Sequence, residues 1–331
     1  METPAIVCEG LRKRFGSKAA LDHLDLSVPQ GTVHGMLGPN GAGKTTAVRI
    51  LATLLRPDSG RAWVAGFDVA RQAPQVRGRI GLAGQNAAVD EILSGRQNLV
   101  MFGRLCHLPA GAARRRADEL FARFALDDAG ARPVRQYSGG MRRRLDLAVS
   151  FIVAPRVLFL DEPTTGLDPR GRNEVWQIIR SLAAAGTTVL LTTQYLEEAD
   201  QLADAVTVIS AGRVIAGGTP DELKALAGGD RVDVTVRHPG DLVRAAGLLQ
   251  SRLSPDVRVD QEGRLLSVPV TDRLDALTRL IESLREANIA AEDITVRRPT
   301  LDDAFLHLTG QRCPHAAVSV GSAPAGQVPA P

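Results

Sequence analysis

The chain has 331 residues, enough for about two domains of ordinary size, with 44% hydrophobic and 23% charged residues. This balance excludes a wholly disordered protein. No run approaches the roughly 18 apolar residues that a membrane-spanning helix needs, and residues 1–16 lack the apolar centre of a signal peptide. We therefore expect a chain that is neither secreted nor membrane-spanning.

Charge and cysteine content exclude further classes of protein. The net charge is +3, with 28 basic and 23 acidic residues in 1–228 and 11 basic and 14 acidic residues in 229–310. Neither part has the clustered basic excess of a nucleic-acid-binding protein. Cys8, Cys106 and Cys313 are scattered along the chain, which favours reduced thiols over a disulfide framework.

In chain order, the first 225 residues alternate short apolar runs with longer helical patterns. Short, buried runs between helices are typical of a parallel sheet that is covered on both faces, so we predict an α/β fold. The predicted strands span 33–37, 80–83, 157–161, 189–193 and 206–210, and the predicted helices between them span 43–55, 174–185 and 196–203.

The segment from about residue 90 to residue 152 differs from this pattern, because it contains helical periodicity and no predicted strand. We interpret them as a helical subdomain inserted into the α/β core, with helices over 97–106, 112–124 and 140–154. Two arginine triplets lie in these helices. Arg114–Arg116 is interpreted as a solvated helix face, whereas Arg142–Arg144 is left without a role.

A second domain follows the Gly228-Gly229 pair. We predict a first domain over 1–226 and a small α+β domain over 229–310, whose βαββαβ order indicates a ferredoxin-like fold. Pro269 predicts that its strand lies at a sheet edge. An amphipathic helix closes this domain, and residues 311–331, rich in Ala, Pro, Gly and Ser, are predicted to be disordered.

A phosphate-binding loop follows the strand predicted over 33–37. The sequence GPNGAGKTT matches G-x-x-x-x-G-K-T, between a strand and a helix as that motif requires. Backbone N–H groups and the helix dipole would hold phosphates, while Lys44 reaches the β- and γ-phosphates and Thr45 offers its hydroxyl to Mg²⁺. These flanks disfavour an incidental glycine-rich turn. The predicted nucleotide-binding residues are Gly38, Pro39, Asn40, Gly41, Ala42, Gly43, Lys44, Thr45 and Thr46.

Two carboxylates end the strand predicted over 157–161. The carboxyl end of such a strand meets the ligand crevice of an α/β sheet. Asp161 suits the coordination shell of Mg²⁺, and Glu162 lies where a general base could orient water toward the γ-phosphate. Asp-Glu after an apolar run is a weak signal alone, but together with Lys44 it predicts a site for nucleotide hydrolysis.

The segment Tyr137-Ser138-Gly139-Gly140-Met141-Arg142 closely resembles the signature sequence of ATP-binding cassette (ABC) ATPases, and it presents a hydroxyl and backbone N–H groups at a helix start. Gln85 resembles the Q-loop glutamine, which the resemblance assigns to nucleotide and Mg²⁺. Residues 166–169 resemble the D-loop and carry Asp168. Phe15 is placed like the aromatic residue that stacks on adenine in that family. The resemblance implies a P-loop NTPase fold of the ABC type, with ATP and Mg²⁺ as substrate and cofactor.

In ABC ATPases, two nucleotide-binding domains enclose two ATP molecules, each between the phosphate loop of one domain and the signature of the other. This chain has one of each, so the resemblance implies a homodimer. It also implies a separate integral membrane permease, touched by the helical subdomain and residues 86–98, and a peripheral location at the cytoplasmic face of the membrane. No nucleic-acid partner is expected.

Gln194 stands where ABC ATPases usually have histidine. Glutamine can donate a hydrogen bond to the γ-phosphate but cannot become cationic, so the predicted catalytic residues are Lys44, Glu162 and Gln194. This glutamine, together with residues 298–306, is similar to the daunorubicin/doxorubicin-resistance ATPases of multidrug exporters. The resemblance implies an ATPase that drives efflux of a drug or natural product, with the C-terminal domain serving assembly. A lipid or other non-drug transporter, a soluble ABC protein and a nucleotide sensor remain as alternatives.

Overall fold

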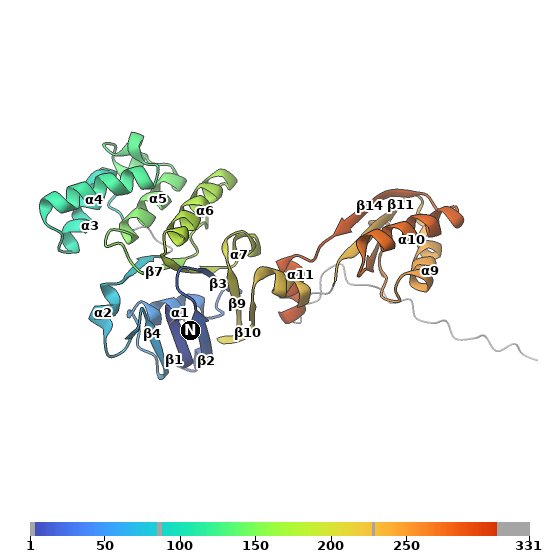
Figure 1. Ribbon diagram of the computed structural model, residues 1–331, viewed down its shortest axis with the longest axis horizontal. Coiled ribbons are helices and arrows are strands. Elements are labelled where there is room, and N and C mark those ends of the chain that lie inside the picture. Colours follow the sequence, from blue (N-terminus) through green and yellow to red (C-terminus); the bar gives the residue numbers. More distant parts are fainter. Residues whose placement is uncertain (1–3, 85–87, 227–228, 310–331) are drawn as a thin grey trace, which may run out of the picture. The chain divides into compact units, whose positions relative to one another are not determined.

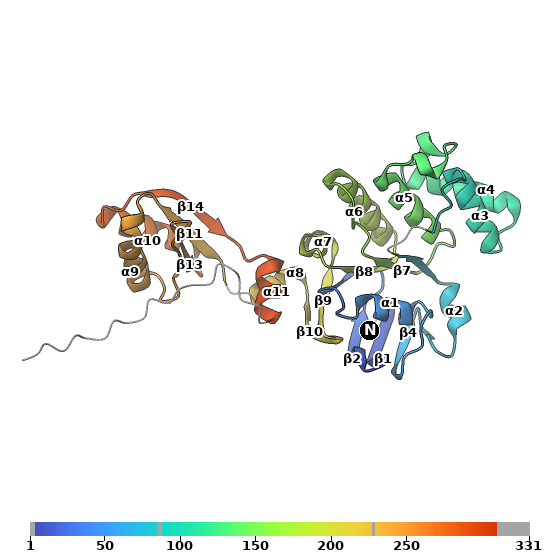
Figure 2. The ribbon, with the colours of Figure 1, turned by 180° about the vertical axis from the view of Figure 1, so that it is seen from behind.

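The computed structural model describes residues 4–84, 88–226 and 229–309 (Figure 1; Figure 2 gives the reverse view). It contains two compact units, Met1–Glu222 and Leu223–Pro331. The division falls within helix α8 (Pro220–Leu226), a few residues before the predicted boundary. Gln85 and the tail predicted to be disordered lie outside the described residues.

A six-stranded sheet forms the centre of the first unit. Five of its strands run parallel, and β10 pairs with β9 in the antiparallel sense. The predicted α/β fold is therefore confirmed. The sheet has the order β10-β9-β3-β8-β7-β6, made from β3 (Val33–Leu37), β6 (Ile80–Ala83), β7 (Val157–Asp161), β8 (Thr188–Thr193), β9 (Ala205–Ser210) and β10 (Arg213–Gly218).

The central strands β3, β7 and β8 are buried along their whole length, because both faces of the sheet are covered. On one face, Leu158 and Leu160 of β7 pack in a core with Val175 and Ile179 of helix α6 (Pro169–Ala184). On the other face, Phe159 belongs to a core shared with helix α1 (Lys44–Leu51). The strand therefore ends between two packed layers, which fixes the position of Asp161.

A second, antiparallel sheet covers part of the α1 side, and the sequence patterns did not predict it. Strand β1 alternates buried and exposed residues, and a short turn joins it to β2, which favours antiparallel pairing. The central sheet is covered on both faces as expected, but part of the cover on this face is a sheet rather than a helix. This sheet has the order β2-β1-β4-β5, made from β1 (Ile6–Phe15), β2 (Lys18–Val28), β4 (Ser59–Val64) and β5 (Phe67–Asp68).

Helices α3, α4 and α5 form the inserted helical subdomain (Figure 1). Helix α6 begins five residues before its predicted start, because Asp168 caps it and Pro169 takes its first position. The triplet Arg114–Arg116 is not wholly solvated, since Arg116 binds backbone carbonyls of the helical subdomain. The remaining helices of the unit are α2 (Ala73–Arg77), α3 (Gly95–Leu105), α4 (Ala110–Arg123), α5 (Gly139–Ser150) and α7 (Leu196–Leu202), with 3₁₀ turns at Asp127–Ala129 and Val134–Gln136.

The second unit has the predicted βαββαβ order. Its four strands are antiparallel in the order β12-β13-β11-β14, as in a ferredoxin-like fold, and the valines of β11 share a core with both helices. Its elements are β11 (Arg231–Val236), a 3₁₀ turn (Pro239–Asp241), α9 (Leu242–Arg252), β12 (Arg258–Asp260), β13 (Leu265–Pro269), α10 (Arg273–Glu286), β14 (Ala291–Arg297) and α11 (Leu301–Thr309).

The expected edge position of the Pro269 strand was wrong, since β13 lies between β12 and β11. The proline is tolerated there because β12 is short. Its pairing with β13 covers only Leu265, Leu266 and Ser267, so Pro269 lies beyond the end of that ladder.

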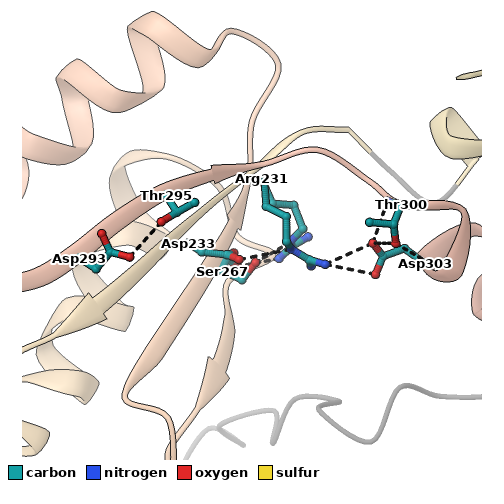
Figure 3. Close-up of polar contacts among 8 residues, drawn as sticks. Arg231, Asp233, Ser267, Asp293, Thr295, Thr300 and Asp303 are labelled. Carbon is teal, nitrogen blue, oxygen red and sulfur yellow. Dashed lines mark hydrogen bonds and ion pairs between the residues drawn. The ribbon is translucent and has the colours of Figure 1, made fainter. Parts of the chain in front are cut away.

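The sheet face that carries Asp233 and Thr295 is polar (Figure 3). Arg297, at the end of β14, forms ion pairs with Asp233 of β11 (3.3 Å) and Asp303 of α11 (3.2 Å). Thr300 begins α11 with a reciprocal cap, in which its hydroxyl accepts the Asp303 N–H and the Asp303 carboxylate accepts the Thr300 N–H. Arg297 therefore ties the start of α11 to the sheet.

Candidate nucleotide site

The phosphate loop joins β3 to α1, and its backbone needs glycine at two positions. Gly41 and Gly43 have φ angles of +81° and +111°, a region that other residues rarely adopt. A Cβ on Gly43 would also overlap the carbonyl oxygen of Ala20 in β2. The loop is therefore shaped by its glycines and is packed against the antiparallel sheet.

Lys44 is the first residue of α1, and its side chain turns back into the loop. Only 4% of the residue is exposed. Its Nζ donates to the carbonyl oxygens of Gly38 (2.6 Å) and Pro39 (3.1 Å). Burial lowers the pKa of Lys44, while the negative charges of Glu162 and Asp161 act in the opposite direction. A buried ammonium that donates to neutral carbonyls of its own loop is suited to an anionic phosphate.

Asp161 brings three elements together at the end of β7. The hydroxyl of Thr45, the second residue of α1, donates to its carboxylate at 3.0 Å, and the hydroxyl of Thr192 in β8 donates at 2.5 Å. A carboxylate beside a threonine hydroxyl is an oxygen set that fits Mg²⁺. Thr192 was not predicted as a site residue. Its position could have indicated a contact with Asp161, because it is a polar residue near the end of β8, the strand beside β7.

Glu162 directly follows β7 and turns the chain sharply. Its φ is +50°, which is uncommon for a residue with a side chain and typical of strain at functional sites. Its N–H donates to the carbonyl of Thr192 (3.0 Å), and its carboxylate accepts from the hydroxyl of Thr165 (3.3 Å). The carboxylate is therefore anchored at the same sheet end as Asp161.

The signature residues lie at the start of α5, beside the start of α6. The side chains of Ser138 and Asp168 cap these two helices. Gly140 faces Gly171 of α6, with 3.7 Å between the position of a Cβ on Gly140 and the Cα of Gly171, and Gly139 faces Leu167 at the same distance. The predicted residues of the signature and the D-loop are therefore neighbours within one chain.

Two further predicted residues flank the phosphate loop and the sheet end. Phe15 ends β1 with 53% of the residue exposed, and it pairs with Lys18, the first residue of β2, whose ammonium lies 4.0 Å from the position of a Cβ on Gly41. An exposed ring near the loop is available for stacking. Gln194 follows β8 directly and is partly exposed, in a turn where the Tyr195 N–H donates to the Thr193 hydroxyl.

Glu198 on α7 is a buried carboxylate near this sheet end that the sequence analysis did not single out. It accepts hydrogen bonds from the Thr164 hydroxyl (2.9 Å) and the Trp176 indole N–H (3.3 Å). Burial raises its pKa. Glu198 thus joins α6 and α7 to the turn that follows Glu162.

The comparisons with known proteins agree with this geometry. The family model for ABC transporters matches residues 21–165, which include the phosphate loop, Asp161 and Glu162. The daunorubicin resistance ATP-binding protein DrrA3 of Streptomyces coeruleorubidus is 65% identical over 94% of this chain and 97% of its own length. The chain belongs to the ATP-binding proteins of ABC transporters. It is thus an ATPase, in the group that contains the daunorubicin and doxorubicin resistance proteins.

Other relatives in this ABC family are less similar over the same length. The daunorubicin/doxorubicin resistance ATP-binding protein DrrA of Streptomyces peucetius is 50% identical, covering 93% of both chains. The Nod factor export ATP-binding protein I of Ralstonia nicotianae is 41% identical, covering 93% of this chain and 95% of its own. The solved structure of cbiO1 from Clostridium perfringens, part of the transporter complex cbiONQ, has a TM-score of 0.63 at 26% identity, over 76% of this chain and 96% of its own. The predicted P-loop ABC fold is confirmed.

Among the helices in the described ranges, none is both long and apolar enough to cross a membrane.

Proposed function

We propose that this ABC ATPase drives the efflux of a drug or natural product through a separate integral membrane permease, from the cytoplasmic face of the membrane. The similarity to relatives named for daunorubicin resistance supports this proposal, because it spans 94% of the chain and so includes the second unit. The relatives named for Nod factor export are less similar to this chain. Because they are not named for a drug, export of a non-drug cargo, such as a lipid, is the second candidate function.

The observation that carries the chemistry is the contact between Thr45 and Asp161 beside the buried Lys44. The two oxygen ligands would hold Mg²⁺, which neutralises phosphate charge when bound, and the segment with Gln85 would complete its site. Lys44 and the loop N–H groups bind and orient the phosphates. Glu162, anchored at the same sheet end, takes the proton of the attacking water, and Gln194 donates a hydrogen bond to the γ-phosphate.

We infer that two copies of this chain act together. Each chain has one phosphate loop and one signature, and Ser138 and Asp168 cap neighbouring helices. In the proposed dimer, the signature of one copy completes the site of the other, and Phe15 stacks on adenine. The helical subdomain and residues of about 86–98 would transmit the closure to the permease.

The substitution Glu162→Gln tests the hydrolytic role. We expect ATP binding to persist, the dimer to be trapped closed, and hydrolysis to fall by about 10²- to 10⁴-fold, the range associated with a general base. Glu197→Gln on α7 is the matched control, because its carboxylate is exposed and pairs only with Arg172 among the ion pairs of the described residues. Hydrolysis by Glu162→Gln at the parent rate would contradict the assignment.

The export role is tested in cells that carry the chain with its permease, by following the fluorescence of accumulated daunorubicin. Faster efflux that disappears with Glu162→Gln is expected. If ATPase activity is present but efflux is unchanged, the cargo is not daunorubicin, and labelled lipid transfer is the next measurement. ATP binding without hydrolysis, even with the permease, would instead favour a nucleotide sensor.

A further inference from the structure

The second arginine triplet, Arg142–Arg144 on α5, sends its three side chains to different places. Arg142 pairs with Glu91 at the surface, and Arg144 pairs with Glu174 of α6. The side chains of Arg143 and Arg144 are similarly buried (11% and 15% exposed), but the guanidinium of Arg143 turns to the backbone of the loops at the end of the central sheet. Three consecutive arginines therefore have distinct roles, and the middle one lies closest to the catalytic end of the sheet.

Arg143 donates to three backbone carbonyls at or beside predicted site residues, and the longest of these contacts is to the carbonyl of Asp161 (3.5 Å). Its Nε donates to the carbonyl of Pro163 (2.6 Å), the residue after Glu162. One terminal nitrogen donates to the carbonyl of Gly84 (2.7 Å), the residue before Gln85. A single planar guanidinium thus connects the signature helix to the two loops that follow β7 and β6.

Asp146, one turn further along α5, completes the arrangement. It pairs with Arg143 at 3.2 Å, and only 4% of its side chain is exposed. Its other oxygen accepts the N–H of Ala88 (3.0 Å). The buried pair therefore forms hydrogen bonds with the backbone of both Gly84 and Ala88.

Burying the Arg143–Asp146 ion pair has a larger desolvation cost than burying apolar side chains at the same positions. Burial alone lowers the pKa of Arg143 and raises that of Asp146, so both charges lose hydration that their contacts must replace. An apolar pair would pack with no such loss. A pair that instead binds four backbone groups fixes those groups in one geometry, and a role in positioning accounts for its presence.

We propose that Arg143 is a positioning residue for ATP hydrolysis: with Asp146, it sets Glu162 and the backbone at Gly84 and Ala88 relative to the signature helix. The proposal rests on the role of Glu162 proposed above. Because Arg143 of the signature helix binds the carbonyls of both Pro163 and Gly84, a shift of α5 acts on the turn after Glu162 and on the residue after β6 together. Signature engagement is thereby tied to hydrolysis without any contact between Arg143 and nucleotide.

The test is Arg143→Lys, which keeps the charge and loses the planar fork. Arg116→Lys is a matched control, since Arg116 on α4 also binds two backbone carbonyls, those of Phe151 and Ile152, and an acid three residues on, Glu119. We expect Arg143→Lys to lower kcat by about 10- to 100-fold with an unchanged Kd for ATP, because a small displacement of a reacting group has effects of this size. Arg116→Lys should keep the parent kcat, even with a lowered Tm.

Hydrogen exchange gives a readout that does not depend on activity. The Ala88 amide should exchange faster in Arg143→Lys and at the parent rate in Arg116→Lys. If Arg143→Lys does not fold, Asp146→Asn carries the same kinetic test, because it keeps an acceptor for Ala88 and removes the charge. In the Glu162→Gln background, Arg143→Lys should cause little further loss, since the two residues act on one step.

Two failures are distinguishable. If the parent hydrolyses ATP in a Glu162-dependent manner and Arg143→Lys matches its kcat, the positioning role is overturned and the proposed function stands. If the parent hydrolyses no ATP with the permease present, the proposed function is overturned, and the positioning role in catalysis with it.

Discussion

His34 makes the stability of the first unit depend on pH. It lies in β3, four residues before the phosphate loop, with 5% of the residue exposed. Its Nε2 lies 2.8 Å from the Thr207 hydroxyl, while its buried Nδ1 has no partner among the described residues. Burial lowers the pKa of His34 to about 4 from an ordinary value of about 6.5.

Between these two pH values, the unfolded chain binds a proton at this histidine and the folded chain does not. The free energy of unfolding therefore falls as the pH decreases from about 6.5 toward 4. The two pKa values give a loss of about 2 kcal/mol at pH 5 relative to pH 7.5. The buried acids Glu198 and Asp146 have raised pKa values and act in the opposite direction, so the effect must be read as a difference from a variant.

The measurement is urea unfolding of the parent, His34→Gln and His107→Gln at pH 7.5 and pH 5. Tryptophan fluorescence follows the first unit selectively, because both tryptophans of the chain, Trp63 and Trp176, lie in it. The parent and the control with the exposed His107 replaced should lose about 2 kcal/mol more than His34→Gln. Equal losses in all three proteins would refute the argument that His34 is buried in its neutral form.

Three further outcomes follow from particular contacts. Gly43→Ala should abolish ATP binding, measured by equilibrium dialysis, since its φ of +111° and the nearby Ala20 carbonyl leave no room for a side chain; parent-like affinity would show that the loop has another shape. Gln194→Ala should slow hydrolysis, and an unchanged rate with unchanged affinity would remove Gln194 from the γ-phosphate site. Arg297→Gln should speed amide exchange in α11, because it removes the ion pairs with Asp233 and Asp303. The free energy of unfolding should fall by about 1 kcal/mol or less for each of these half-exposed pairs. Parent-like exchange in α11 would mean that other contacts hold the helix.

The strands around the site were predictable because burial leaves a simple mark in the sequence. β3, β6 and β7 have the predicted bounds, since each is a short apolar run that ends at glycine or at a carboxylate. The contact of Thr45 with Asp161 follows from the same logic, because parallel strands bring their carboxyl ends to one edge.

The features that were missed depend on contacts between distant parts of the chain. The pairing of β1 with β4 joins segments about 50 residues apart, and neither segment carries a strong local signal for it. The direction of Arg143 was equally hidden, because its neighbours are the same residue type and only the packing of α5 decides which one reaches the loops that follow β6 and β7. The early start of α6 shows the reverse case, in which Asp168 and Pro169 carried a local signal.

The most direct test of the central claim is the ATPase rate as a function of protein concentration, with and without the permease, using Glu162→Gln as the control. If two copies hydrolyse ATP as proposed, the specific rate rises cooperatively with concentration, increases with the permease and is lost in Glu162→Gln. Tight ATP binding with no hydrolysis at any concentration, permease included, would contradict the account and make Gln194 the residue to explain.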